Sequence, residues 1–533
     1  MDKPWLILYL LIACAHLSYQ KSTVDSPTYT AAVVEYPPIY FLNDVRTLKL
    51  NTEAYIRYIK IASLNNTDII VFPEDGLTTV YLPEREKMGD WTTIIPSASF
   101  NYTPCIQDTI KVSETLKNIS CAARNNEIYV VINIAEKVPC TDVSCPKDKV
   151  LYYNSNVVFD RTGKIIARYR KTNLFMERQF NVTAVPEIVT FDTDFGVKFG
   201  TFICFDILFR EPALQLTRLY QITDFVYPAS WFSEVPFLTA VQTQAGWSFA
   251  EDVNLLASGY NRPAAGSTGS GIYLGRKGIA KAIFSKTTHE EILISEVPKI
   301  KGEIKHHKNH HDHSNDQDQK VWPYFHGQEE IYDKSRKKRQ DNIMAVNDTI
   351  FLLHEDIQVY QTLSLKGNAT ETVCQNDFCC EFEVKIAKID PSTKYRLAVF
   401  NDIRHHVAAE AALHACGIIQ CSNDSISSCV SVQKSETVFN NIEITATIHD
   451  YKNHLIMPST LNTDIFPLKD WTFNQHIHND HVHISMSLNN NNTKNLVTFG
   501  IFSRNFNTNN ANRSFYSINC FIILFISLIL PKF

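Results

Sequence analysis

The chain has 533 residues, of which 44% are hydrophobic, and its 51 Lys and Arg against 56 Asp and Glu give a formal net charge of −5. At roughly 100 to 200 residues per domain, this length predicts more than one domain and excludes a disulfide-dense miniprotein. The near balance of charge leaves no overall basic field, which argues against nucleic-acid binding as the main activity.

Residues 1–15 are typical of a secretory signal peptide. The apolar run 5–13 is too short to cross a bilayer, and Ala13-Cys14-Ala15 resembles a signal-peptidase cleavage site. Residues 11–14 also fit a bacterial lipoprotein signal, but nine Asn-x-Ser/Thr sequons beside a signal peptide favour a glycosylated eukaryotic ectodomain. The predicted acceptors are Asn65, Asn101, Asn118, Asn181, Asn347, Asn368, Asn423, Asn491 and Asn512.

A second apolar segment, 515–530, closes the chain after a polar stretch of small residues at 503–514. This layout predicts that residues 507–533 are a GPI-attachment signal whose tail is removed. A true membrane helix and a mostly secreted form are the alternatives. We therefore expect an extracellular protein, held at the cell surface through a lipid anchor or secreted, with no other membrane contact.

The first three hundred residues alternate short apolar runs with amphipathic stretches. Residues 53–64, for example, show apolar side chains near helical spacing. Strands alternating with helices predict a layered α/β domain over residues 28–300. The runs expected to be buried strands are 31–34, 68–72, 128–134, 157–159, 199–204, 225–229, 254–257 and 292–297.

The composition changes at residues 301–343, which we interpret as an exposed linker rich in His and basic residues. Five histidines within 306–313 are able to bind a metal, but a flexible polar tract is the simpler interpretation. The basic run Arg336-Lys337-Lys338-Arg339 is either a solvated charge cluster or a site for a proprotein-processing protease. Beyond it, residues 344–506 have many short β-prone segments and six cysteines, which predict a smaller, β-rich, disulfide-stapled domain.

One segment of this second domain concentrates imidazoles. Residues 475–483 predict a hairpin with a two-residue turn at Asn479-Asp480. Alternation would place Ile477 and Val482 on one face and four imidazoles on the other. These four are able to hold zinc or copper, and a solvated polar face is the alternative. They are His476, His478, His481 and His483.

Three segments of the first domain each place a reactive group beside a predicted strand. Glu74 follows a buried strand that ends in a proline, Lys171 follows a basic stretch, and Cys204 ends a strand just before an expected helix. Alone, each has an ordinary explanation as a turn carboxylate, a surface lysine or a buried thiol. Together they suggest nucleophilic catalysis, because a helix N-terminus favours thiolate, a carboxylate is able to deprotonate the thiol, and a lysine is able to stabilise a developing oxyanion.

In the contexts FPEDGL, YRKTNLF and GTFICFDILF, this order of Glu74, Lys171 and Cys204 resembles the nitrilase superfamily. The stretches LYYNSNVVFDRTGKIIARYRKTNLFMERQFN, YPASWFSEVPFLTAVQTQAGWSFAEDVNLLASGYNRP and STGSGIYLG resemble its vanin and biotinidase branch. The resemblance implies an α-β-β-α sandwich followed by a further domain. It covers residues 28–300 strongly, and the linker departs from it.

The resemblance implies an amidohydrolase that cleaves a linear, non-peptide amide through a thioester. Cys204 would be the nucleophile, Glu74 the proton acceptor, and Lys171 the oxyanion stabiliser and proton donor, with the backbone N–H of Phe205 assisting. No cofactor and no metal are implied for this reaction. Glu177 is a candidate supporting carboxylate with either a positioning or a surface role. Asp206, Trp231 and Tyr260 either border the pocket or pack in the core.

The small-molecule substrate is left open by the sequence. Vanins cleave pantetheine and biotinidases release biotin from biocytin, and we expect pantetheine first. A surface or secreted binding protein on a catalytically retired scaffold is the alternative from another class, and an intact Glu-Lys-Cys set argues against it.

The cysteine count tests the assignment of Cys204. Of 13 cysteines, Cys14 is expected to leave with the signal peptide, and Cys520 leaves if the tail is removed. If Cys204 is free, four remain in the first domain and six in the second, both even numbers. We therefore predict five disulfides within domains, with undetermined connectivity, and one free thiol.

Overall fold

The computed structural model describes residues 21–143, 145–300, 350–405, 410–488 and 492–507. The predicted signal peptide, the linker with its basic run, the predicted attachment signal from residue 508 on, and the sequons at Asn347, Asn491 and Asn512 lie outside these residues. Within the described ranges, no helix is long and apolar enough to span a membrane.

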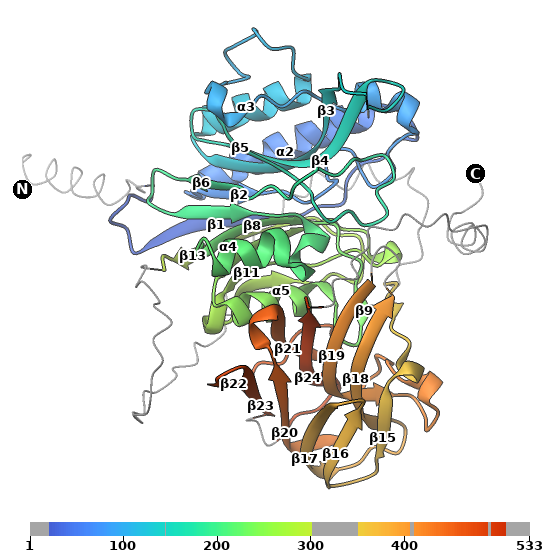
Figure 1. The fold of residues 1–533 in the computed structure, drawn as a ribbon. Helices are drawn as coiled ribbons and strands as arrows, with labels where there is room; N and C mark the ends of the chain where they lie inside the picture. The colour runs from blue at the N-terminus through green and yellow to red at the C-terminus, as the bar shows by residue number, and fades with distance from the viewer. Residues whose placement is uncertain (1–20, 144, 301–349, 406–409, 489–491, 508–533) are drawn as a thin grey trace, which may run out of the picture.

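The first domain contains two six-stranded sheets that lie face to face between helices (Figure 1). In the first sheet the strand order is β13-β1-β2-β3-β4-β5, and helices α2 and α3 cover its outer face. The bounds are β1 (Thr28–Glu35), α2 (Arg46–Leu64), β2 (Ile69–Val71), α3 (Glu114–Asn126), β3 (Tyr129–Pro139), β4 (Val150–Phe159), β5 (Ile165–Arg170) and β13 (Glu291–Pro298).

The second sheet has the order β12-β11-β10-β8-β7-β6, and α4 and α5 lie on its outer face. Its elements are β6 (Thr190–Asp192), β7 (Lys198–Thr201), α4 (Gln215–Arg218), β8 (Asp224–Ala229), α5 (Ala240–Glu251), β10 (Asn254–Gly259), β11 (Ser270–Leu274) and β12 (Ile279–Ile283). Short helical turns on this chain are η1 (Arg85–Trp91), η2 (Ala98–Phe100), η3 (Cys204–Leu208), η4 (Arg210–Leu214), η5 (Pro263–Ala265) and η6 (Gly275–Lys277).

Strand β1 shows why this is a four-layer sandwich. Its alternate residues Tyr29, Ala31 and Val33 pack between the two sheets, while Ala32 and Val34 pack against the helices. A strand buried on both faces has no polar side to show, which explains its continuous apolar run. The α-β-β-α fold expected from the sequence is confirmed, and all eight predicted strands are present.

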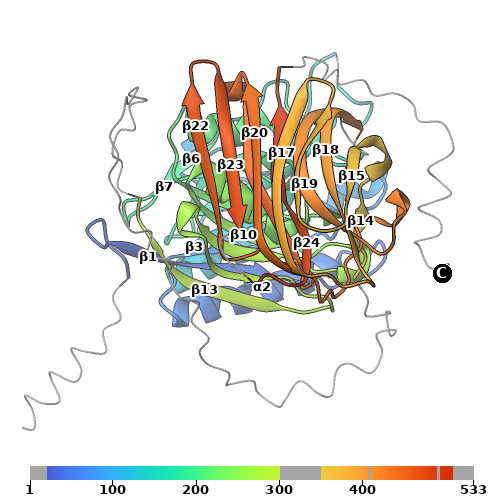
Figure 2. The ribbon, with the colours of Figure 1, turned by 90° about the horizontal axis from the view of Figure 1, so that it is seen from below.

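The second domain is a sandwich of two five-stranded sheets around its own apolar core (Figure 2). One sheet has the order β15-β18-β19-β24-β21 and the other β16-β17-β20-β23-β22. Their bounds are β15 (Gln361–Leu365), β16 (Ala369–Gln375), β17 (Phe378–Lys388), β18 (Lys394–His405), β19 (Glu410–Cys421), β20 (Val438–His449), β21 (His454–Asn462), β22 (Trp471–His478), β23 (His481–Leu488) and β24 (Leu496–Asn505), with short turns η8 (Ile357–Val359), η9 (Ile426–Ser428) and η10 (Tyr451–Asn453).

Helix α5 joins the two domains, because the second domain packs on the face of α5 that points away from its own sheet. A Cβ on Gly246 would lie 2.6 Å from the carbonyl oxygen of Pro458 in β21, so this approach requires glycine. Gln242 Nε2 also donates to Ser459 Oγ at 2.8 Å. A helix buried on nearly all sides has no polar stripe, which explains its weak amphipathicity.

The two domains are also joined by a short strand that precedes the second sandwich in sequence. Strand β14 (Leu353–His354) pairs in parallel with β9 (Glu234–Val235) of the first domain. Arg404 of β18 then hydrogen-bonds Glu234 and lies 3.2 Å from Glu355, which is buried. Strand β14 therefore adds to the first domain before the β-rich domain starts.

All ten cysteines predicted to pair are in disulfides, and Cys204 is the one free cysteine within the described residues. Cys380–Cys416 links the two sheets of the second domain, since β17 and β19 belong to different sheets. The predicted division of four and six cysteines between the domains is confirmed. The other pairs are Cys105–Cys121, Cys140–Cys145, Cys374–Cys379 and Cys421–Cys429.

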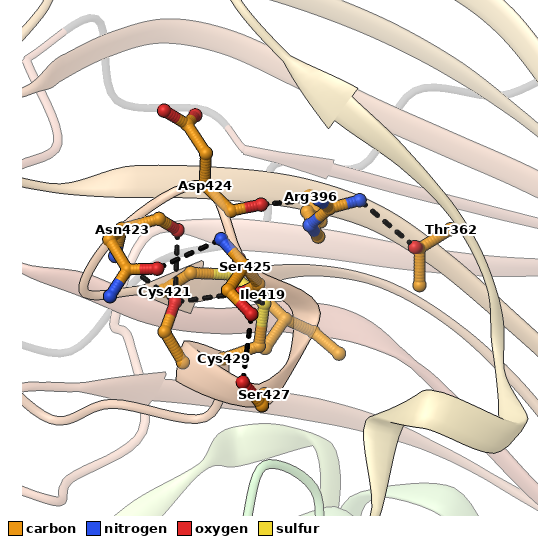
Figure 3. Close-up of a disulfide and its surroundings, with 10 residues drawn as sticks. Thr362, Arg396, Ile419, Cys421, Asn423, Asp424, Ser425, Ser427 and Cys429 are labelled. Atoms are coloured by element: carbon orange, nitrogen blue, oxygen red, sulfur yellow. Dashed lines mark hydrogen bonds between the residues drawn. A yellow bond between two sulfur atoms is a disulfide. The ribbon is translucent and has the colours of Figure 1, made fainter.

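The described sequons lie at the surface. Figure 3 shows Asn423 in the loop closed by the Cys421–Cys429 disulfide, where its Oδ1 accepts from Ser425 N at 2.8 Å. Asn181 is half-buried, and its Oδ1 accepts from Tyr152 N at 2.9 Å. The exposed acceptors are Asn65, Asn101, Asn118, Asn368 and Asn423. Glycosylation at these positions stays a prediction.

We predict that the denatured, unreduced mature protein contains one titratable thiol. The five disulfides leave only Cys204 unpaired among the described residues, and Cys14 and Cys520 are expected to leave with the two terminal segments. Titration with a thiol reagent in denaturant measures the count. The Cys204→Ala variant is the control and should give zero, whereas a second thiol in that variant would contradict the assignment.

Candidate active site

The three candidate residues come together at the ends of strands from both sheets. Glu74 lies beyond β2, Lys171 directly follows β5, and Cys204 lies beyond β7. Their exposed fractions are 1%, 2% and 6%. Lys171 Nζ lies 2.6 Å from Glu74 Oε1, and the Glu74 carboxylate also hydrogen-bonds the Cys204 thiol. Residues distant in sequence thus form one buried cluster.

Cys204 occupies a tighter turn than the sequence predicted. Strand β7 ends at Thr201, and Cys204 starts η3, a five-residue helical turn, where the sequence predicted a strand end followed by a helix. Its φ of +46° lies in the left-handed region, which is strained for a residue other than glycine. Tyr227 Oη donates to the Cys204 carbonyl oxygen at 2.8 Å and helps to hold this conformation.

The expectation of a resting thiolate is not supported. Burial raises the pKa of the Cys204 thiol well above its usual range, and the negative charge of Glu74 raises it further, against the lowering effect of Lys171. A short turn supplies too small a helix dipole to reverse this. The thiol therefore rests neutral and needs an adjacent base when it reacts.

Glu177 is a partner of Lys171 and not a surface residue, with 15% of its side chain exposed. Its two carboxylate oxygens lie 3.1 and 3.0 Å from Lys171 Nζ, and its Oε2 accepts from Phe175 N at 2.7 Å. Burial raises the pKa of Glu177 to about 7, against the lowering effect of Lys171, with Glu74 adding to the rise. Of the two roles considered for Glu177, the geometry matches positioning.

Lys171 keeps its charge in this setting. Burial by itself lowers the pKa of its ammonium, but the carboxylates of Glu177 and Glu74 outweigh burial and raise the pKa well above the usual value. Lys171 carries one positive charge beside two carboxylates. When Glu177 is protonated near neutral pH, the negative charge of Glu74 alone balances the ammonium of Lys171.

Two hydrogen-bonded asparagines, which were not identified from the sequence, orient the carboxylates of Glu74 and Glu177. Asn154 Nδ2 on β4 donates to Glu74 Oε1 at 2.8 Å and to Glu177 Oε1 at 2.5 Å, and its Oδ1 accepts from Asn133 at 2.6 Å. Ser230 N donates to the other Glu74 oxygen at 2.9 Å. Buried amides inside an apolar strand cost free energy unless paired, so the polar NSN within LYYNSNVVF was the available signal.

Asp206 ties the cysteine turn to the loop after Lys171. Its Oδ2 accepts from Tyr169 Oη at 2.7 Å and from Ile203 N at 3.0 Å. Its Oδ1 accepts from the backbone N and the Nδ2 of Asn173 at 2.9 and 2.8 Å. Burial raises its pKa to about 6, although these hydrogen bonds lower it. The sequence suggested that Asp206 borders the pocket or packs in the core. In the structure, its hydrogen bonds join the turn at Cys204 to the loop after Lys171.

An aromatic cluster starts at Phe205, the residue after Cys204. The ring of Phe205, which follows Cys204, packs edge-on against Phe175 at 5.2 Å, and Phe175 stacks on Phe232 at 6.0 Å. Trp231 and Tyr260 are both buried, and Trp231 donates to the Leu238 carbonyl. Core packing thus accounts for Trp231. The assignment of the Phe205 backbone N–H to an oxyanion remains a prediction.

Comparison with known proteins places this site in a family. Residues 30–233 match the carbon-nitrogen hydrolase family model and residues 350–509 match the vanin C-terminal domain. The chain is 34% identical to Vanin-like protein 1 of Drosophila melanogaster, with 93% of this chain and 90% of the relative covered. It is 31% identical to pantetheinase of Homo sapiens, with 84% of each covered. The chain belongs to the vanin family of carbon–nitrogen hydrolases.

This membership makes the chain an amide hydrolase, as the resemblance in the sequence implied. Among solved structures, an amidase from Nesterenkonia sp. AN1 is similar at 13% identity and a TM-score of 0.38, covering 51% of this chain and 92% of the amidase. The match to the carbon-nitrogen hydrolase model ends at residue 233, yet the second sheet of this vanin-family chain continues through β12.

Replacing Asp206 should impair turnover more than substrate binding. Asp206→Asn places an amide N–H against donors and loosens the turn at Cys204, so we expect kcat to fall about 10- to 100-fold with little change in KM. Steady-state kinetics on a cleavable amide, with thermal unfolding measured in parallel, tests this expectation.

Asp224→Asn is the matched control. Asp224 is also a buried carboxylate that accepts hydrogen bonds, here from Tyr29 Oη and Asn254 Nδ2, both at 2.8 Å, at the far end of β8. We expect it to lose stability but to keep kcat per folded molecule. Equal losses of kcat in both variants would mean that Asp206 acts only on stability.

Proposed function

We propose that the chain hydrolyses pantetheine to pantothenate and cysteamine. The main support is the buried 2.6 Å Lys171–Glu74 pair beside the free Cys204, in a chain that aligns with pantetheinase of Homo sapiens over 84% of both sequences. The linear amide of pantetheine joins a carboxylic acid to a small amine, which a thioester mechanism is able to cleave.

In the first half of the proposed reaction, Glu74 accepts the thiol proton as Cys204 Sγ attacks the amide carbon. The raised pKa of the thiol means that this transfer must accompany attack, and the Glu74 carboxylate is within hydrogen-bonding reach. Lys171 and the Phe205 N–H stabilise the oxyanion. Glu74 then returns the proton to the amide nitrogen, the C–N bond breaks, and cysteamine leaves.

In the second half, Glu74 accepts a proton from water while the water oxygen attacks the thioester carbon. The C–S bond breaks, the sulfur of Cys204 takes the proton back, and pantothenate leaves. Asn154 and the Ser230 N–H hold the Glu74 carboxylate in one orientation for both proton transfers. Glu177 balances charge at Lys171 without contacting the reacting atoms.

The balance of charge supports a substrate that is neutral around the scissile bond. Glu74 and Glu177 already pair with Lys171, so the ammonium does not present an unpaired charge that would hold a substrate carboxylate. The rings of Phe175 and Phe232, which continue from the ring of Phe205, favour apolar contact with the acyl part.

We expect the purified protein to release cysteamine from pantetheine, and Cys204→Ala to lower kcat at least about 10⁴-fold because the nucleophile is lost. Glu74→Gln should give a loss of similar order while keeping the Ser230 N–H bond. Free thiol and pantothenate measure the reaction, and biotin release from biotinyl-lysine is measured in parallel.

Asp224→Asn serves as the fold control and should keep turnover. Preferred cleavage of biotinyl-lysine would make the chain a biotinidase with the same mechanism. Activity that survives Cys204→Ala would refute the roles assigned above, and a folded protein inactive on every amide tried would support the retired-scaffold alternative.

We also propose that the protein is extracellular and held by a GPI anchor. Five disulfides and the surface position of the described sequons support an oxidising, secretory route. The last described strand, β24, ends at Asn505, before the predicted attachment signal begins in the sequence.

Phosphatidylinositol-specific phospholipase C should release the protein from the surface of expressing cells. A chain truncated after Asn507 keeps every described strand and should be secreted in active form. Surface protein that resists the enzyme, under conditions that release a known anchored control, would contradict the anchor.

A further inference from the structure

Three imidazoles form a row across neighbouring strands of the second domain. His449 ends β20, His481 begins β23 and His478 ends β22. His449 faces His481 across one strand pair, and His478 faces His481 across the next. The ring centroids lie 5.6 and 5.7 Å apart. The predicted hairpin with its turn at Asn479-Asp480 is therefore confirmed, and β20 adds a histidine that the hairpin alone did not include.

The row lies on the face of its sheet that points away from the core of the sandwich. The neighbouring residues Ile448 and Val482 are buried in the core of the sandwich, so the alternating histidines point the other way. Ile477 lies on the same face as Val482, as predicted, but 51% of it is exposed, because β22 is the edge strand of its sheet among the described residues.

A carboxylate completes the cluster. Asp480 in the turn has its Oδ1 3.3 Å from His481 Nδ1. One ligand atom from each of His449, Asp480 and His481 lies within 4.8 Å of the others. Ligands of a tetrahedral zinc ion sit about 2.0–2.2 Å from the metal, so small side-chain rotations are enough for these atoms to converge.

Two tight turns and a hydrogen bond between them hold the backbone around the cluster in place without a bound ion. Asn479 and Asp450 take left-handed φ values of +52° and +48°, as tight turns require. Asp450 N donates to the Asp480 carbonyl oxygen at 2.7 Å, which ties the turn after β20 to the hairpin turn. Donors on strand ends held this way lose little conformational entropy when they bind an ion.

We propose that His449, His481 and Asp480 bind a divalent transition metal ion of the zinc type, with His478 as the fourth ligand. Two or three imidazoles with one carboxylate are a donor set that zinc accepts, whereas calcium and magnesium prefer oxygen ligands. The ion would cross-link β20, β23 and β22. The other end of β22 contacts α5 through Trp471 and Phe249, whose rings lie 4.9 Å apart, so the ion would brace the free end of that sheet and take no part in amide hydrolysis.

Zinc titration of the metal-free full-length protein by calorimetry tests the site. We expect the stoichiometry to fall by one ion in the His449→Ala/His481→Ala variant relative to the unmodified chain. The comparison uses differences because the histidines of residues 306–313 are also able to bind zinc. Zinc should raise the unfolding temperature of the unmodified protein but not of this variant.

The His476→Ala/His483→Ala variant is the matched control, because it removes two imidazoles that pair with each other on the same face, one step along the strands. It should keep both the ion and the thermal shift. Asp480→Asn, at an exposed turn position, should weaken binding about 10- to 100-fold without unfolding the domain. Equal zinc loss in both double variants, or unchanged stoichiometry in the first, would overturn the proposal.

Discussion

The active site depends on one buried ammonium. Lys171 is 2% exposed, and a charge in such a place is stable only with partners that replace water. Glu74 and Glu177 supply the opposite charge, and Asn154 orients both carboxylates through one amide group. Without Glu74 the ammonium would keep only Glu177, and without Asn154 both carboxylates would lose a hydrogen bond. The segments that follow β2 and β5 and the middle of β4 therefore have to be held in place together.

The cysteine reaches this cluster through a strained turn. The positive φ of Cys204 lasts because several contacts determine it, among them the four hydrogen bonds accepted by Asp206 and the bond from Tyr227 to the Cys204 carbonyl. The two sheets stack so that β2 and β7 present their carboxyl ends to the same region. The second domain packs on α5 and covers the helical layer behind β8.

Much of this arrangement was predictable from the sequence, and the misses have physical causes. The buried strands of the first domain were found because strands covered on both faces are apolar throughout. The role of Asp206 was not found, because an acid beside a reactive cysteine looks the same whether it borders a pocket or receives hydrogen bonds from a distant loop. Asn154 is a similar case, since a polar residue inside an apolar run shows that a partner exists but not which one.

The sequence by itself determined the layered class of the first domain, the identity of the reactive cysteine and the parity of the disulfides, since these follow from local periodicity, motif and count. Only the tertiary structure decided the neutral state of the Cys204 thiol, the position of Glu177 beside Lys171 and the meeting of His449 with His481. Burial, charge pairing and strand register are long-range properties. They arise when segments distant in the chain pack together, and no local pattern records them.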